Sequence, residues 1–219
     1  MKAFVAGATG ETGRRIVAQL VERQIPVRAL VRNREKAAEI LPAGVEIVVG
    51  DVQQADKLEA LIADCSVLLC ATGARPSFNP TEPLLVDYLG TKNLIDAAKK
   101  KGIEHFVLVT SLCVSNFFHP LNLFWLILFW KKQAEDYLIN SGLTYTIVRP
   151  GGLKNEDNLN AIKMSSADTL SEGNIPRTKV ASVCVESLFY PAANNKILEI
   201  VAPSDAPNLD WPQLFQSVT

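Results

Sequence analysis

Three evenly spaced glycines, Gly7, Gly10 and Gly13, follow the apolar residues 3–6 and open an amphipathic stretch at 14–21. A strand, a glycine turn and a helix in this order expose backbone N–H groups at a helix N-terminus, where the helix dipole favours an anion. The pyrophosphate of a dinucleotide is the usual anion at such a turn. The pattern therefore predicts a dinucleotide site formed by the whole turn, namely Gly7, Thr9, Gly10, Glu11, Thr12 and Gly13. The alternative is an ordinary turn between a strand and a helix, with no ligand.

The second expected strand, residues 27–31, is followed directly by Arg32. About 20 residues past the glycines, dinucleotide-binding folds place either an acid that binds the ribose of NAD or an Arg that accommodates the 2′-phosphate of NADP. A guanidinium can hold a phosphate through two parallel hydrogen bonds. The sequence therefore predicts NADP(H) as the cofactor, held by Arg32 with Arg34 and Lys36 as helpers. A solvated basic turn is the alternative.

Strand and helix patterns alternate along most of the chain, which predicts a parallel sheet covered by helices on both faces. Further strands are expected at 45–49, 66–70, 105–109, 144–148 and 196–201, and further helices at 55–63, 84–101, 131–140, 178–189 and 211–218. A polar loop with three prolines is expected at 74–83. We predict a single α/β domain with a doubly wound parallel sheet, the NAD(P)-binding Rossmann fold. Residues 1–150 form its core, and 151–219 form a small C-terminal lobe that includes the last strand.

Ligands of such sheets bind beyond the carboxyl ends of the strands. The polar residues at these ends are therefore expected to meet at one edge and to contact the cofactor. Asp51 and Val52 are expected near the adenine, and Thr72 and Gly73 near the ribose and pyrophosphate. The remaining members of this cofactor-binding set are Ala71, Thr110, Pro150 and Gly151, with Ser111 near the nicotinamide. For each residue alone, turn formation is the alternative.

The composition limits the classes of partner and site. The 219 residues carry 22 Lys and Arg against 23 Asp and Glu, a net charge of −1, so we expect no nucleic-acid partner. Four scattered cysteines and two histidines predict neither a disulfide framework nor a metal site, and favour a reducing compartment. We expect a cytoplasmic location. Because the sequence opens on a core strand, we expect no signal or transit peptide in it.

The motifs GATGETG, ALVRN, VVGDV, ATGA, VDYLGTKNLIDAAK, FVLVTS and YTIVRPGGL together resemble the short-chain dehydrogenase/reductase superfamily, in its atypical NAD(P)H-binding branch. The later IPRTKVA segment is also typical. The first half is similar to the small flavin and biliverdin reductases. The tract from 122 to 153 resembles the NADPH-binding domain of a redox-linked subunit of the chloroplast inner-envelope translocon, and small related proteins of plants and cyanobacteria.

This resemblance implies two catalytic residues, Ser111 and Lys131, and Lys131 would also bind the cofactor. The superfamily's catalytic Tyr should stand four residues before Lys131, where this chain has Ile127. Asp87 replaces an Asn that supports a proton relay. Since Ile127 cannot donate a proton to an alkoxide, the expected reaction is hydride transfer from NADPH to a small planar acceptor, such as a flavin or a quinone. The alternative is a non-catalytic NADPH-binding sensor or scaffold for a redox protein partner.

The segment 117–130 is unusually apolar. Its uninterrupted part, residues 123–130, is far shorter than the roughly 20 residues that span a bilayer, so no transmembrane segment is expected. Three interpretations remain open: a buried core helix, a wall of a substrate pocket, or an exposed patch with peripheral membrane or partner contact through 121–130. Glu135 is expected at the helix surface or as a cap, and Tyr88 in core packing. The sequence does not indicate an oligomeric state.

Overall fold

The computed structural model describes residues 1–74 and 79–218. Residues 75–78 of the expected polar loop, and Thr219, lie outside the described part. The main sheet has the strand order β3-β2-β1-β4-β5-β6-β10-β8. Neighbouring strands run parallel throughout, except that β10 and β8 are antiparallel. The strands are β1 (Ala3–Ala6), β2 (Val27–Val31), β3 (Glu46–Val49), β4 (Val67–Cys70), β5 (His105–Val109), β6 (Tyr145–Pro150), β8 (Lys163–Ser165) and β10 (Lys196–Val201).

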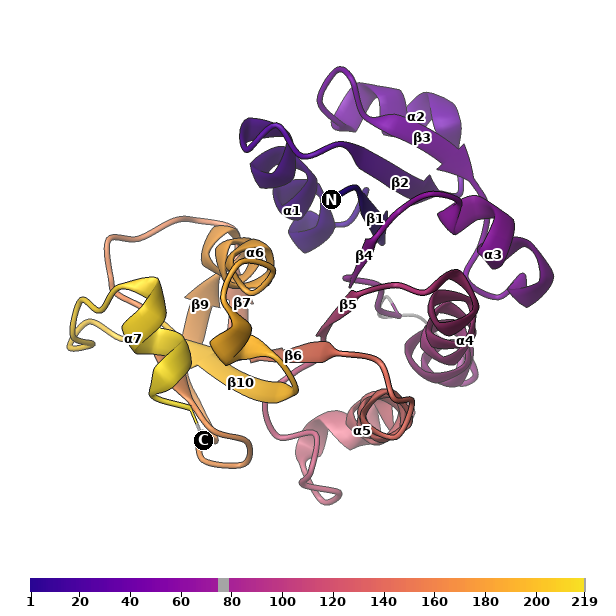
Figure 1. The fold of residues 1–219 in the computed structure, drawn as a ribbon. Coiled ribbons are helices and arrows are strands. Elements are labelled where there is room, and N and C mark those ends of the chain that lie inside the picture. Colours follow the sequence, from indigo (N-terminus) through magenta and orange to yellow (C-terminus); the bar gives the residue numbers. More distant parts are fainter. Residues whose placement is uncertain (75–78, 219) are drawn as a thin grey trace.

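Helices cover both faces of this sheet (Figure 1). One face carries α1 (Glu11–Glu22), α2 (Arg34–Ile40), α6 (Arg177–Glu186) and α7 (Trp211–Gln216). The other carries α3 (Ala55–Ile62), α4 (Thr91–Lys101) and α5 (Ile127–Ile139). The strands separate two apolar cores because alternate residues point to opposite faces: Val5 packs with α1, and Phe4 packs with α3 and α4. The predicted doubly wound Rossmann fold is confirmed.

The C-terminal residues are partly integrated into the main sheet. β10 pairs with β6, and α6 packs closely against α1. A separate two-stranded sheet joins β7 (Gly152–Lys154) to β9 (Asn174–Pro176) beside this edge. A short 3-10 turn, η3 (Pro191–Ala193), precedes β10. The division of the domain at residue 150 remains a prediction.

The apolar segment before α5 is exposed, so the interpretation as a buried core helix is wrong. A 3-10 turn, η2 (Pro120–Leu123), is followed by Trp125 and Leu126, both in the left-handed backbone region with φ 59°. Side chains here reach into solvent, with exposed fractions of 92% for Phe118 and 84% for Leu123. The left-handed residues stop any helix from forming before Ile127, where α5 begins.

Candidate functional site

The glycine turn forms a backbone cradle at the end of β1. Gly7 adopts φ +79°, and a Cβ there would lie 2.6 Å from the Ala71 carbonyl oxygen, so only glycine fits. The Gly10 N–H donates to the Gly7 oxygen over 2.9 Å, which closes the turn. Helix α1 then begins at Glu11, and no side chain caps its N-terminus. The first N–H groups of α1 therefore remain available for an anion, which fits the pyrophosphate of a dinucleotide.

The cradle opens into a groove of about 760 Å³, part of it open to solvent. Among the predicted cofactor-binding residues, those that line the groove are Gly7, Thr9, Gly10, Arg32, Asp51, Val52, Ala71, Thr72 and Gly73. The sequence reasoning missed the other lining residues, Leu30, Val31, Gly50, Gln53, Glu82 and Val86. Leu30 and Val31 lie in a buried strand, and the strand pattern gave no signal that they also face a ligand.

Arg32 is exposed in this groove, and no carboxylate of the described residues pairs with it. The expected helpers are placed differently. Arg34 donates to the Ile47 carbonyl oxygen over 2.8 Å, and neither Arg34 nor Lys36 lines the groove. The basic group that faces the groove from the end of β2 is thus Arg32.

Two residues of the predicted turn, Glu11 and Gly13, contribute in other ways. Glu11 forms ion pairs with Arg14 and Arg15 across the first turn of α1. The hydrogen bond from Arg15 holds the pKa of Glu11 below its usual range. Gly13 allows α1 to pack on the turn, since a Cβ there would lie 2.1 Å from the Gly7 oxygen. Neither these residues nor Thr12 lines the groove.

A second cavity, of about 820 Å³ and also partly open to solvent, lies beyond the ends of β5 and β6. Four predicted site residues line it: Thr110, Ser111, Pro150 and Gly151. His119 and Leu121 also line it, and they come from the apolar segment 117–130, for which a pocket wall was one of the open interpretations. The residues that the sequence reasoning did not place here are Leu112, Cys113, Gly152, Leu153, Ser171, Glu172, Gly173 and Arg177. Most of them come from irregular segments, for which periodicity gives no signal. Arg177 lies in the IPRTKVA segment, which could have pointed to it.

Lys131 is held by a buried ion pair at the same edge. Its Nζ lies 2.6 Å from Oδ1 of Asp87, and both side chains are largely buried. The other Asp87 oxygen accepts from the Ala74 N–H over 3.2 Å. Asp87 lies in η1 (Leu84–Gly90), a π-helical segment that leads into α4. A Cβ on Gly73 would be 3.7 Å from Lys131 Nζ, so the ammonium reaches the turn that lines the dinucleotide groove.

The hydroxyl of Thr110 is hydrogen-bonded to a buried side chain of the protein. It donates to Glu135 over 2.6 Å, and Glu135 also accepts two hydrogen bonds from Arg149. Glu135 is completely buried, so the expectation of a surface or capping carboxylate is wrong. Burial disfavours the charged form of Arg149, but the hydrogen bonds and charge of Glu135 outweigh it and raise the pKa of Arg149. The hydroxyl of Thr110 therefore has no proton left to donate to a ligand.

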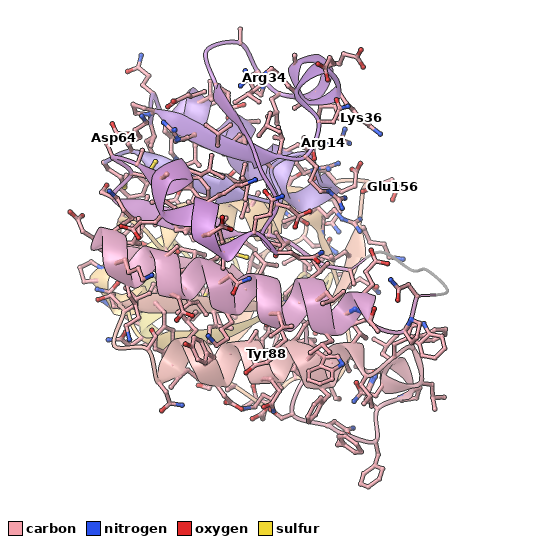
Figure 2. All side chains as sticks on the ribbon, turned by 90° about the vertical axis from the view of Figure 1, so that its right-hand side faces the viewer. Arg14, Arg34, Lys36, Asp64, Tyr88 and Glu156 are labelled. Atoms are coloured by element: carbon pink, nitrogen blue, oxygen red, sulfur yellow. The ribbon has the colours of Figure 1, made fainter. Side chains whose placement is uncertain are left out.

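No tyrosine of the described chain takes the vacant catalytic position. Ile127 is the first residue of α5 and is half-buried, one turn before Lys131. Tyr88 stacks on Trp130 with ring centroids 6.0 Å apart, where the long helical segment faces α5 (Figure 2). Tyr137 donates to Asp96 over 2.6 Å, and Tyr145 lies in β6.

The described residues contain no cluster of three or more His, Cys, Asp or Glu side chains able to hold a metal ion. Cys113 lies at the second cavity, but its Sγ donates to the Ser171 oxygen and burial raises the pKa of the thiol. The site is therefore a dinucleotide cradle with a neighbouring cavity, built from backbone, hydroxyl and charged groups.

A family model described as NAD(P)H-binding matches residues 7–191, which include the cradle, Lys131 and Arg177. The chain belongs to this NAD(P)H-binding family. It shares 47% identity with an uncharacterised chloroplastic protein of Arabidopsis thaliana, covering 99% of this chain and 82% of the relative. Sanguinarine reductase of Eschscholzia californica is 32% identical, with 99% and 95% covered. The chloroplastic Protein TIC 62 of Pisum sativum is 37% identical over 93% of this chain, which spans 43% of that protein's length.

Among solved structures, an anaerobilin reductase from Escherichia coli O157:H7 superimposes with a TM-score of 0.79 at 26% identity, covering 94% of this chain and 100% of the other. The expected resemblance is confirmed, and so is the binding of NAD(P)H. The preference for NADP(H) over NAD(H) stays a prediction. The family is of an oxidoreductase type.

Two expectations need correction. The cytoplasmic location is wrong, because the plant relatives at 47% and 37% identity are chloroplastic proteins, which points to the chloroplast. These relatives also give no support for a cyanobacterial source. Within residues 1–74 and 79–218, no helix combines the length and apolar character needed to cross a membrane.

Proposed function

We propose that this NAD(P)H-binding protein is an NADPH-dependent oxidoreductase that reduces a small planar acceptor of the flavin or quinone type. The observation that carries the proposal is the pair of cavities beyond the carboxyl ends of parallel strands. One holds the dinucleotide cradle and Arg32, and the other holds Ser111 with no tyrosine among the described residues that line it. Two similar proteins, the sanguinarine and anaerobilin reductases, are named as reductases, which supports this reaction class.

When bound, NADPH supplies a hydride to the acceptor. The cradle of Gly7 and Gly10 binds the pyrophosphate, and Arg32 binds the 2′-phosphate. Lys131, oriented by Asp87, binds on the ribose side, and the Ser111 hydroxyl donates a hydrogen bond in the second cavity. Ile127 offers no proton, so the acceptor itself must stabilise the incoming charge. A conjugated ring does so, and one proton from solvent completes a two-electron reduction.

The reaction is tested by stopped-flow oxidation of protein-bound NADPH against a panel of flavins and quinones. At least one acceptor is expected to accelerate oxidation above the rate of free NADPH with the same acceptor. If none does, the enzymatic proposal is overturned.

The cofactor preference is tested with Arg32→Ala. Loss of a charged hydrogen bond to the 2′-phosphate should weaken NADPH binding by about tenfold to a hundredfold and leave NADH binding nearly unchanged. Arg34→Ala is the matched control, because Arg34 binds a carbonyl oxygen outside the groove. Equal effects on NADPH and NADH would remove Arg32 from the 2′-phosphate site.

The exposed apolar residues favour a second candidate function, an NADPH-binding sensor or scaffold that docks on a protein or membrane. The patch consists of Phe117, Phe118, Leu121, Leu123, Phe124, Trp125 and Leu126. Such a concentration of apolar surface is typical of a contact site. Vesicle flotation of the protein, with and without NADPH, tests peripheral membrane contact. Flotation that the double substitution Leu123→Ser with Phe124→Ser abolishes would support it, and absence of flotation would contradict it.

A further inference from the structure

The second cavity carries a cation whose charge is not balanced by an ion pair. Arg177, the first residue of α6, lines it. Among the described residues its hydrogen bonds both come from Nη1, which donates to Asn155 Oδ1 over 2.9 Å and to the Leu153 oxygen over 3.4 Å. Both acceptors are neutral. The guanidinium therefore keeps its charge and further N–H donors for another partner.

The other described arginines make this arrangement informative. Five of them form ion pairs with carboxylates: Arg14, Arg15, Arg23, Arg28 and Arg149. Arg34 binds a backbone oxygen outside either cavity. The two that line a cavity, Arg32 and Arg177, have no carboxylate partner among the described residues. Arg32 faces the expected position of the 2′-phosphate. Because Arg177 likewise has no carboxylate partner, this arrangement indicates an anionic ligand in the second cavity as well.

The helix that begins at Arg177 adds to this field. α6 has ten residues, and no side chain caps its N-terminus at Pro176. The positive end of the helix dipole therefore lies at the same wall as the guanidinium. Glu172 also lines the cavity, but it is exposed and forms no ion pair with Arg177.

The rest of the wall is suited to an apolar ring. Leu112, Leu121 and Leu153 line the cavity, and Leu121 continues into the exposed apolar patch. The cavity thus combines an apolar surface with one cationic corner, while Ser111 marks the side nearest the end of β5.

We propose that the hydride acceptor is a planar conjugated molecule with an anionic substituent, a phosphate, carboxylate or sulfonate, and that Arg177 binds this substituent. The inference rests on the proposed reductase function and names the substrate class of the same site. Arg177 is a specificity-determining residue: it selects and orients the acceptor, and the reduction still takes its hydride from NADPH and its proton from solvent.

FMN and riboflavin form a matched pair of probes, because they share the isoalloxazine ring and differ by one phosphate. A naphthoquinone sulfonate against the parent naphthoquinone forms a second pair. The wild-type protein should prefer the anionic member of each pair. In Arg177→Gln, the ratio of kcat/KM for FMN to that for riboflavin should fall by about tenfold to a hundredfold, the range for losing a hydrogen bond between charged groups.

Lys179→Gln is the control, because it removes the same charge from the same helix at a residue that does not line the cavity. Its FMN to riboflavin ratio should equal that of the wild type. If Arg177 only supports the fold through Asn155, kcat/KM falls equally for FMN and riboflavin in Arg177→Gln. The FMN to riboflavin ratio then stays constant. That result would overturn the inference.

Equilibrium binding separates this inference from the proposed function. Flavin fluorescence titrations of the protein saturated with NADP⁺ give dissociation constants without turnover. If no acceptor is reduced but FMN binds more tightly than riboflavin in an Arg177-dependent way, the reductase function fails and the anion site stands. If acceptors are reduced with no dependence on Arg177, the function stands and the anion site fails. If no acceptor of the panel is reduced, and neither FMN nor the naphthoquinone sulfonate is bound, both fail.

Discussion

His105, the first residue of β5, should make the stability of this protein fall in mildly acidic solution. The side chain is buried, and its Nε2 lies 2.8 Å from the Thr146 hydroxyl. That hydroxyl donates to the Ala193 carbonyl oxygen, so it accepts from the ring. His105 is therefore neutral with its proton on Nε2, and burial lowers its pKa from 6.5 to about 4.

The direction of the change in stability with pH follows from the linkage between protonation and folding. Between the lowered folded pKa and the ordinary unfolded value, the unfolded chain binds the proton and the folded chain does not. Stability is therefore lost as the pH falls through this window. One pKa unit corresponds to about 1.4 kcal/mol, so lowering the pH from about 7.5 to about 4.5 should cost about 2.5 kcal/mol. With an m-value of about 1–3 kcal/mol per molar, the urea midpoint should fall by about 1–2.5 M.

The assay is urea unfolding at a series of pH values for the wild type and for His105→Gln. The glutamine amide can still donate to Thr146 but does not titrate, so the variant should lack the part of the pH-dependent loss that His105 causes. The difference between the two curves then gives that part directly. Glu186, whose pKa burial raises, contributes with the opposite sign but equally in both proteins. His119→Gln, which replaces the other histidine, should keep the wild-type slope. An unchanged slope in His105→Gln would refute the reasoning.

Two further substitutions test the cradle and the buried charges. Gly7→Ala forces a Cβ to 2.6 Å from the Ala71 oxygen and should weaken NADPH binding at least about tenfold in fluorescence titrations. Gly44→Ala is the control, because Gly44 has a similar φ of +85° but open space around it. It should only lower stability by roughly 1 kcal/mol. Arg149→Met leaves Glu135 and Glu199 buried without their cation and should cost about 3–5 kcal/mol, or about 6–20 °C in Tm by calorimetry. Arg14→Met, at an exposed pair, should cost at most about 1 kcal/mol; a similar loss in both Arg variants would contradict the role of burial.

The sheet and the dinucleotide cradle could be predicted because their determinants are local. A buried parallel strand such as β4 is a short apolar run, and a positive φ next to a crowded backbone requires glycine at position 7. The end of β2 fixes Arg32 by position alone. For the strands, Gly7 and Arg32, the neighbouring residues in the sequence are enough to predict the local structure.

The buried charge network could not be predicted in this way. Arg149 binds Glu135, Asp168 and Glu199, which come from a helix, a loop and the last strand. Glu199 further accepts three backbone N–H groups at residues 168–170. Glu135 and Glu199 look like surface residues in their own segments, and only the fold buries them, whereas Asp168 stays exposed. The sequence left the exposed patch as one of three interpretations, because nothing local indicates that Trp125 and Leu126 adopt left-handed conformations without glycine.

Lys131 shows how this chain separates binding from proton supply. In the superfamily that the motifs resemble, the lysine both binds ribose and lowers the pKa of a tyrosine. Here the position of that tyrosine is Ile127, and the charge of Lys131 is balanced by Asp87 at 2.6 Å. Burying an ammonium is costly without such a partner, and the Asp87 carboxylate offsets this cost. A cation held in this way still serves binding of the cofactor. Acceptors that need a proton from the protein during hydride transfer should therefore react poorly, and acceptors that hold the charge in their own ring should react well.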